Sequence, residues 1–562
     1  MSEQDDTQRR EYEERLQRRL KILKDEFEAG KIVIAPGLQV IESLKAVRYA
    51  ADGTIDLSTV DGLVRSMALM AEHIHERGEA KKAASLREIQ ELYFNFLYLN
   101  FKPYFETMLK GKLTPHEAGL AISRSEQSRK EFLRALPDFM EAIEGFWAGM
   151  AGALHAHLED MHGTMKCSYG GDIFPSHAEN IASKCGLYAD TIILPDPFLR
   201  SREIFANWSE EKSVYYLVKN AMNVLQYREL ALANVEPPIV VISPDYSELV
   251  RNEKKFVGLV SESDCLAHAS RIFGRKFESM DSLMEYAEHF DTLDTLLPEI
   301  KDPRRVLFDA ELKGGAREHI TSMLDDPSSA LLKSKHPGVV VAASAFGRMA
   351  QANDLLIKSR RLGATPVIDA PTSWQYFVWK LEYDADRASE GAPQTDDLHV
   401  LRALESLSHT DMEWLGKVPP RALIELRESG ALAEIRSIMA AGVKEVAEAR
   451  PDNFFRSKDR VFENLERALD VHQGQLDALR AKTWKFAGKD IGTWVVTGTV
   501  AVSAALTGYP IFALAALAVD QVVDVPKLKD IPESIKELAK ESKKLRQSPV
   551  GLLFSYRKMA ER

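Results

Sequence analysis

The feature that most constrains this chain is a run of 29 uncharged residues, Ile491 to Val519, in a sequence in which 28% of the residues are charged. An apolar run longer than about 18 residues is a candidate membrane span, because a bilayer core takes about 20 helical residues to cross. Gly508, Tyr509 and Pro510 interrupt the run. Proline lacks an amide donor and glycine frees the backbone, so the run forms either one kinked span or two short apolar helices.

Basic residues on both sides of the run favour the two-helix form. Basic flanks stay on the cytoplasmic side of a membrane, and a hairpin over 491–525 keeps both flanks there, whereas a single span does not. Trp494, near the start of the run, is an aromatic residue of the kind found at membrane interfaces. The flanking lysines are Lys482, Lys485, Lys489, Lys527 and Lys529. We therefore predict an apolar hairpin that either inserts into a membrane or is buried among the protein's own helices.

Length, charge and cysteine content narrow the class of protein. A chain of 562 residues is expected to form several domains. Its net charge of −11 argues against nucleic-acid binding by the whole chain, whereas the tail at 526–562 carries ten basic and five acidic residues, a net charge of +5 that suits an anionic membrane surface. Three cysteines and an N-terminus without an apolar signal core predict a cytoplasmic protein, at the inner membrane if the hairpin inserts.

The hydrophobic pattern changes twice along the chain. Spacings of three and four residues predict a helical bundle over 1–165, as in the apolar stripe of Tyr12, Leu16, Leu20, Leu23 and Phe27. Short β-branched runs alternate with helical stretches over 166–385, which predicts a central α/β domain with a parallel sheet. The five predicted strands lie within 190–198, 237–247, 305–312, 338–344 and 365–373. A helical domain at 386–490, the hairpin at 491–525 and the basic tail at 526–562 complete a fold that is mostly α.

Four of the five predicted strands end in or run into an aspartate, and the fifth ends at Ser344. The aspartates are Asp196, Asp245, Asp309 and Asp369. Ligands of open α/β sheets bind beyond the carboxyl ends of the strands, where converging carboxylates could hold Mg²⁺ and a serine could face an anion. Aspartate and serine are also preferred turn and N-cap residues, so local capping is the competing interpretation. Lys358 and its basic neighbours are expected to form a solvated helix end rather than a phosphate clamp.

A weaker candidate site is the trio His155, Glu159 and His162, whose spacing places the three side chains on one helix face. Glu159 and His162 match the Glu-x-x-His pattern of di-metal bundles, but the sequence nominates no further glutamates, so we assign no metal to this face. The chain has no Gly-x-x-x-x-Gly-Lys-Ser/Thr phosphate loop, no Gly-x-Ser-x-Gly elbow and no His-Glu-x-x-His zinc helix. The sequence therefore identifies no cofactor.

Three hypotheses for function follow. The favoured one is a membrane-associating cytoplasmic protein that acts through the C-terminal hairpin, for example a regulated membrane-disrupting effector of toxin or antiviral defence type. The second is a metal-dependent enzyme that acts on a phosphate-containing substrate at the strand ends. The third is a helical scaffold that binds a partner protein. The sequence favours a membrane partner over an enzymatic role.

Overall fold

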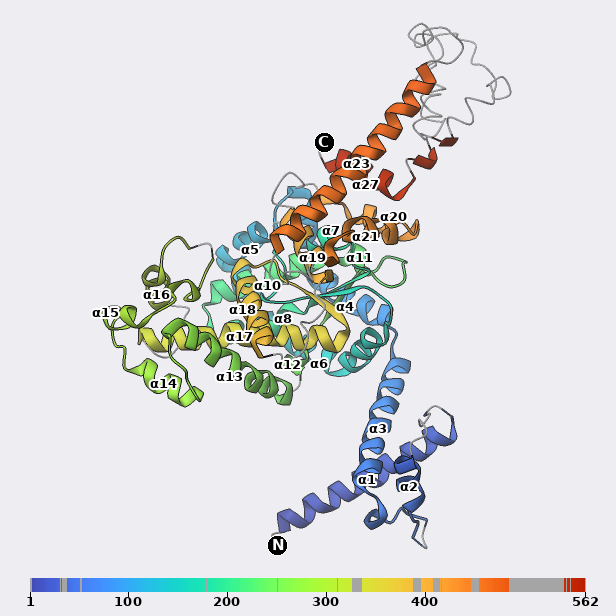
Figure 1. The fold of residues 1–562 in the computed structure, drawn as a ribbon, viewed down its shortest axis with the longest axis vertical. Coiled ribbons are helices and arrows are strands. Elements are labelled where there is room, and N and C mark those ends of the chain that lie inside the picture. The colour runs from blue at the N-terminus through green and yellow to red at the C-terminus, as the bar shows by residue number, and fades with distance from the viewer. Residues whose placement is uncertain are drawn as a thin grey trace. The chain divides into compact units, whose positions relative to one another are not determined.

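The computed structural model describes residues 3–560 except for a set of short segments and one long one, 485–539. The short segments are 31, 33–37, 51–52, 177–179, 250, 311, 326–335, 388–395, 408–414, 416, 446–453, 542 and 546. The described part is mostly helical around one small parallel sheet, as predicted (Figure 1). Trp494, Gly508, Tyr509 and Pro510 of the predicted hairpin lie outside the described residues, as do Lys485, Lys489, Lys527 and Lys529 of its flanks.

One compact unit consists of Met1–Tyr93 together with Glu144–His162. Its core joins Leu16, Leu20 and Leu23 of the predicted stripe to Val64 and Ala68. The two ends of that stripe, Tyr12 and Phe27, are exposed. The helices and the 3-10 turn that begin this unit are α1 (Glu3–Glu28), α2 (Leu38–Ala46), η1 (Leu57–Thr59) and α3 (Gly62–Ala83). The predicted domain boundaries at 165, 385, 490 and 525 stay predictions.

The second unit, Phe94–Ile143 with Gly163–Arg562, holds the sheet. The helices that precede the sheet in the chain are α4 (Leu86–Gly111), α5 (Pro115–Arg124) and α6 (Glu126–Asp160). Between the first and last strands come α7 (Ile181–Cys185), α8 (Pro197–Arg200), α9 (Arg202–Asn207), α10 (Glu210–Leu225), α11 (Arg228–Ala231), α12 (Tyr246–Leu249), α13 (Arg251–Phe273), α14 (Met280–Glu288), α15 (Leu293–Leu296), η2 (Leu297–Glu299), η3 (Pro303–Arg305), α16 (Ala316–Asp325) and α17 (Pro337–Leu362). After the sheet come α18 (Pro371–Arg387), α19 (Asp396–Leu407), α20 (Pro420–Glu428), α21 (Leu432–Ala440), α23 (Phe454–Trp484, which contains Lys482) and α27 (Pro549–Ala560).

The sheet has four parallel strands in the spatial order β3-β2-β1-β4. The strands are β1 (Lys166–Tyr169), β2 (Thr191–Pro195), β3 (Val240–Ser243) and β4 (Ala364–Val367). Every residue of β1, β2 and β3 is buried, and successive residues point to opposite faces, so both faces of these strands are covered. Strand order reverses at β1, which lies between β2 on one side and β4 on the other.

Two of the five strand predictions were wrong. The run at 338–344 is the first part of α17, a 26-residue helix with Pro337 at its first turn and Gly363, at φ 57°, ending it. The predicted strand at 305–312 begins at the last residue of η3, and none of its described residues is in a strand. A β-branched run can form either a strand or a buried helix, and in this protein tertiary packing stabilises the helix. Strand β1 was not predicted, whereas β2 and β3 fall within two of the remaining runs and β4 overlaps the third, beginning one residue before it.

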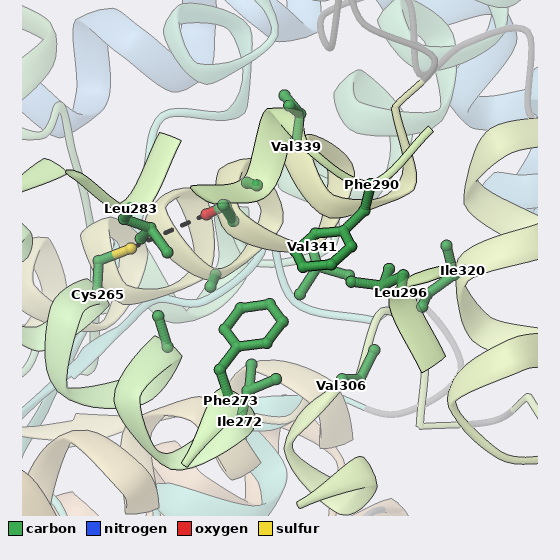
Figure 2. Packing of buried hydrophobic residues seen from close by; sticks show 14 of the residues in the cluster. Cys265, Ile272, Phe273, Leu283, Phe290, Leu296, Val306, Ile320, Val339 and Val341 are labelled. Atoms are coloured by element: carbon green, nitrogen blue, oxygen red, sulfur yellow. Dashed lines mark hydrogen bonds between the residues drawn. The ribbon is translucent and has the colours of Figure 1, made fainter. Parts of the chain in front are cut away.

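A hydrophobic cluster fixes α17 against α13 and α14 (Figure 2). Phe273, Leu283 and Val341 point into this cluster from the three helices, and the thiol of Cys265 lies 3.9 Å from the carbonyl oxygen of Ala342. Helix α17 also packs against β1 and β4. The cluster and the packing on β1 and β4 together fix the position of the helix that carries Lys358.

Candidate functional site

The carboxyl ends of all four strands lie at one edge of the sheet, because the strands are parallel. An aspartate follows each strand within three residues: Asp172 after β1, Asp196 after β2, Asp245 after β3 and Asp369 after β4. Three of these were predicted from sequence. Their surroundings differ, so each is described separately.

Asp196 is a capping residue. It is buried at the N-cap of α8, and its carboxylate accepts hydrogen bonds from the backbone amides of Phe198 (2.8 Å) and Leu199 (2.9 Å). This is the local role that aspartate plays at helix starts. For Asp196 the capping interpretation of the sequence was the right one.

Asp245 is the centre of a buried ion network. Its carboxylate accepts hydrogen bonds from Nε of Arg200 (2.5 Å) and Nζ of Lys358 (2.7 Å). Burial opposes ionisation of Asp245, but the two cations outweigh it and hold the pKa of the carboxyl well below its usual range. Burial lowers the pKa of the Lys358 amine, and Asp245 opposes that shift. Lys358 is thus a buried ion-pair residue, not the solvated helix end predicted from the sequence.

The network continues along α17 through Asp354, one turn before Lys358. Burial, together with the charge of Asp245, raises the pKa of Asp354. Arg200 donates a further hydrogen bond to the backbone carbonyl of Asp172 in the loop after β1. The ion network therefore ties α8, α17 and the loops after β1 and β3 together.

Asp369 is tied to the loop after β1. Its carboxylate accepts hydrogen bonds from the hydroxyl of Tyr169 (2.5 Å) and the backbone amide of Ser176 (2.8 Å). The loop itself is tightly packed, because Gly171 has φ 82° and a Cβ there would lie 2.8 Å from Cβ of Ser373. The hydroxyl of Ser373 donates to the carbonyl of Gly171 (2.5 Å). Glycine is needed at this position, and the packing fixes where the next residue, Asp172, lies.

Asp172 is exposed, yet protein surrounds it closely enough to change its ionisation. Desolvation raises the pKa of its carboxyl, the amide of Ile173 opposes that shift, and the charge of Asp369 adds to it. Lys219 on α10 lies close by. Desolvation lowers the pKa of the Lys219 amine and the charge of Asp172 opposes this. Perturbed groups of opposite charge at the carboxyl edge of a sheet are typical of functional sites.

The other predicted site residues do not follow a strand of the sheet. Asp309 follows no strand, and Ser344 lies in the interior of α17, so the strand-end position predicted for each was wrong. The backbone amide of Ala310, next to Asp309, donates to the hydroxyl of Thr372 on α18 (2.8 Å). In the first unit, Glu159 is paired with Arg77, His155 is buried and His162 is exposed. Among the described residues, no three histidines, cysteines or carboxylates are grouped so that they could hold a metal ion.

Sequence reasoning missed Asp172, Arg200 and Lys219. The available signal was the pair Gly170–Gly171 before Asp172, since paired glycines mark a turn after a short strand. That signal was not used because the four residues of β1 were not identified as a strand. Nothing in the sequence places Arg200 and Lys219 near this loop, because both come from helices after the next strand.

No known protein family, curated protein or solved structure matches this chain significantly. In the described part of the chain, no helix combines the length and apolar character of a membrane span.

Proposed function

We propose that this protein associates with a membrane through the apolar hairpin predicted at 491–525. The observation that carries the proposal is the uncharged run Ile491–Val519 with basic residues on both flanks. The run is rich in glycine, alanine, serine and threonine, which let two helices approach closely in a bilayer. The net positive tail at 526–562 supports the same partner through attraction to anionic lipid.

The most specific form of the proposal is a regulated membrane-disrupting effector of toxin or defence type. Each half of the hairpin has about 17 residues, which is marginal for crossing a bilayer core of about 30 Å. A marginal hairpin has similar free energies in the membrane and against protein, so a trigger of a few kcal/mol shifts it from one to the other. Release of a trapped dye from vesicles measures this disruption directly.

Vesicle flotation tests the membrane proposal. Wild-type protein is expected to float with vesicles, whereas Leu506→Asp/Leu514→Asp is expected to bind at least about tenfold more weakly. Each aspartate puts a charge into the apolar run, which costs up to about 3 kcal/mol depending on its depth in the bilayer. The matched control is Leu259→Asp, which places the same change on α13, where the leucine is 66% exposed. Point substitutions are preferable to truncation before the hairpin, which would remove α27, whose Tyr556 hydroxyl donates to the carbonyl of Ala422 (3.1 Å).

The outcomes separate membrane insertion from burial. Wild-type protein that stays below the vesicles at every lipid composition contradicts the proposal. If, in addition, Leu506→Asp/Leu514→Asp lowers the unfolding temperature while Leu259→Asp does not, the hairpin is a buried structural element.

A second candidate function is an enzyme that acts on a phosphate-containing substrate at the carboxyl edge of the sheet. The observation that favours it is the pair Asp172 and Asp369, which interact electrostatically beside β1, where strand order reverses. Open α/β sheets bind ligands at such reversal points. Mg²⁺ is commonly held by one or two carboxylates together with substrate phosphates, so two carboxylates are a sufficient protein share of such a site. No observation on the described residues favours the scaffold hypothesis in the same way.

Phosphate release from nucleoside triphosphates and phosphate monoesters, with MgCl₂ present, tests the second function. Asp172→Asn is expected to lower the rate at least about 100-fold, since removing one charged catalytic partner costs about 3 kcal/mol. Asp294→Asn is the control, because Asp294 is an 85% exposed carboxylate on α15, paired with Arg317. Equal rates for wild type and Asp172→Asn, or no turnover of any of these substrates, contradict the enzyme hypothesis.

A further inference from the structure

The first compact unit exposes a large share of the protein's apolar side chains. Of the fifteen large hydrophobic side chains that are exposed among the described residues, nine belong to this unit, although it comprises only Met1–Tyr93 and Glu144–His162. On α3, Met70 is 65% exposed, Ile74 52% and Leu63 37%. Exposed apolar side chains gathered on one element are typical of an interaction surface.

The apolar side chains of α3 follow one another with the spacing of a helix-packing seam. Successive members are four, three and four residues apart, which is the heptad spacing of coiled coils. This set, called the open stripe below, consists of Leu63, Met67, Met70 and Ile74. Met67 is partly buried and the other three are exposed, so the seam lacks a partner helix over this part of α3.

A different stripe of α3 is already packed. Val64, Ala68 and Ala71 are buried in the core that α3 shares with α1. Each residue turns a helix by about 100°, so the open stripe lies about a quarter-turn around α3 from this buried one. Neighbouring helices of a four-helix bundle lie a quarter-turn apart in the same way. The pair α1 and α3 therefore resembles half of such a bundle.

The open stripe carries no charge of its own. With histidine neutral, the charged residues of α3 between positions 63 and 74 are Arg65 and Glu72. Arg65 donates to the hydroxyl of Tyr12 (3.3 Å), and the carboxylate of Glu72 accepts from Nε of Arg19 (2.5 Å). Both are thus directed toward α1, on another side of the helix, and the open stripe fits an apolar partner.

Beyond Ile74 the same stripe is in contact with another helix of the unit. Arg77 and Lys81 follow at the next intervals of three and four residues. Arg77 pairs with Glu159 and Asp160 of α6, and Nζ of Lys81 lies 2.6 Å from the carboxylate of Asp160. Asp160 is the last residue of α6. The open stripe therefore continues an existing helix–helix contact from the point where α6 ends.

We propose that the open stripe is the interface of a homodimer, in which α3 packs antiparallel against α3 of a second copy. The intervals four, three and four are the same in both directions, so the stripe is complementary to itself about a two-fold axis. Leu63 of one copy then meets Ile74 of the other, and Met67 meets Met70. The two α1–α3 pairs together form a four-helix bundle. This inference is independent of both candidate functions.

A second copy fits this surface better than a lipid membrane does. The first unit has 15 basic and 21 acidic residues, a net charge of −6, which anionic lipid repels. Helices that lie in a membrane interface have basic residues beside their apolar face, whereas here Arg65 is directed toward α1. The symmetric spacing of the open stripe has a direct explanation only in pairing with itself.

Sedimentation velocity of the full-length protein, at concentrations from about 1 to 100 µM, tests the dimer. Wild-type protein is expected to dimerise in this range. Met70→Glu is expected to raise the Kd of the dimer at least about tenfold, because it places a charge in the seam twice by symmetry. Leu259→Glu is the matched control, since Leu259 on α13 is 66% exposed, against 65% for Met70, and lies outside the stripe.

Disulfide cross-linking tests the antiparallel register. Position 63 of one copy lies beside position 74 of the other, whereas the two positions 63 are about 16 Å apart, because eleven residues of helix separate them. A mixture of Leu63→Cys and Ile74→Cys proteins, oxidised with copper phenanthroline, is expected to form a covalent dimer that neither variant forms alone. The three native cysteines are buried, which keeps the background low.

The other outcomes overturn the proposal in distinguishable ways. Wild-type protein that stays monomeric to about 100 µM has no such interface. If it is monomeric and Met70→Glu also weakens vesicle flotation, the open stripe is a lipid-binding surface instead. A dimer that Met70→Glu leaves as stable as wild type uses another surface, and cross-linking within each single-cysteine variant shows parallel pairing. Thermal unfolding of Met70→Glu is expected to match that of wild type, because the side chain is exposed.

Discussion

At the scale of single residues, the most consequential interaction is the ion network of Asp245. Its two cationic partners are themselves buried or nearly so, with Lys358 only 3% exposed. Burying a charge costs desolvation free energy, and only the attraction to an oppositely charged partner offsets that cost. The sequence identified Asp245 as a strand-end residue but could not reveal that its partners come from α8 and α17.

Replacing Asp245 with asparagine is expected to lower the free energy of unfolding by about 3–5 kcal/mol, because Lys358 and Arg200 lose their counter-charge. Urea unfolding at neutral pH measures the change. The double substitution Asp245→Asn/Lys358→Met is expected to be less damaging than the sum of the two single changes, since it also removes the unpaired lysine. Strict additivity of the two single changes contradicts this account of the network.

A second residue with a buried ionisable group is His268 on α13. Its Nε2 donates to the carbonyl of Arg305 (3.0 Å) and its Nδ1 accepts from the hydroxyl of Tyr383 (2.8 Å), an arrangement that fits one neutral tautomer. Burial, together with the nearby charge of Arg305, lowers the pKa of His268 from 6.5 to about 4, and the hydrogen bond to Arg305 only partly opposes this.

The unfolded chain binds a proton at His268 near pH 6.5, whereas the folded chain binds it only near pH 4. The contribution of this residue to stability is therefore complete above pH 6.5, and about 3 kcal/mol is lost as the pH falls from 6.5 to 4. His268→Gln is expected to show a smaller loss over this range than wild type. Urea unfolding midpoints at pH 7 and 4.5 measure the difference, and identical pH dependence in the two proteins contradicts the assignment.

At the scale of elements, α17 shows how packing overrides a local pattern. Its first residues are a β-branched run that predicted a strand, but Gly338 lets the helix approach α14 closely. A Cβ at Gly338 would lie 2.2 Å from the carbonyl oxygen of Ala287. Gly347 in the same helix has nothing within 4 Å of that position. The two glycines thus differ in packing while sharing one helix.

Gly338→Ala is expected to destabilise the protein by about 1–3 kcal/mol through the clash with Ala287, even though alanine favours a helix. Gly347→Ala is expected to stabilise it by up to about 1 kcal/mol, since only the helix preference changes. Thermal or urea unfolding of the two variants gives the comparison. Equal effects at the two positions contradict the close approach of α14 and α17.

The strands show how much of the fold could be predicted from the sequence. β2, β3 and β4 were predicted because each is β-branched and bounded by turn residues. β1 was missed because Lys166–Tyr169 is only four residues long, begins with a lysine and contains no β-branched residue. The aspartates that follow the three correctly predicted strands were identified from the sequence. Asp172 was not identified, because the strand that precedes it was missed. Lys219 and Arg200 join the site only through tertiary packing, which no local pattern records.

At the scale of the whole molecule, the charge distribution gives a prediction for membrane binding. The net charge of −11 repels an anionic surface while the tail at 526–562 attracts it. Raising the NaCl concentration from about 0.05 to 0.5 M shortens the range of both effects but leaves an inserted apolar hairpin in place. We therefore expect flotation with anionic vesicles to weaken but to persist at high salt. Complete loss at high salt indicates adsorption by the tail alone.

The reversal of strand order at β1 has a consequence for synthesis on the ribosome. β1 pairs with β2, which follows soon in the chain, but its other neighbour is β4; Tyr169 and Asp369, hydrogen-bonded in the folded protein, are 200 positions apart. At about 5–20 residues per second, β1 emerges roughly 10–40 s before its second partner. During that interval a central strand is an edge strand, able to pair with another chain. During synthesis, the strand that precedes the candidate-site loop therefore has an open edge that the finished sheet closes.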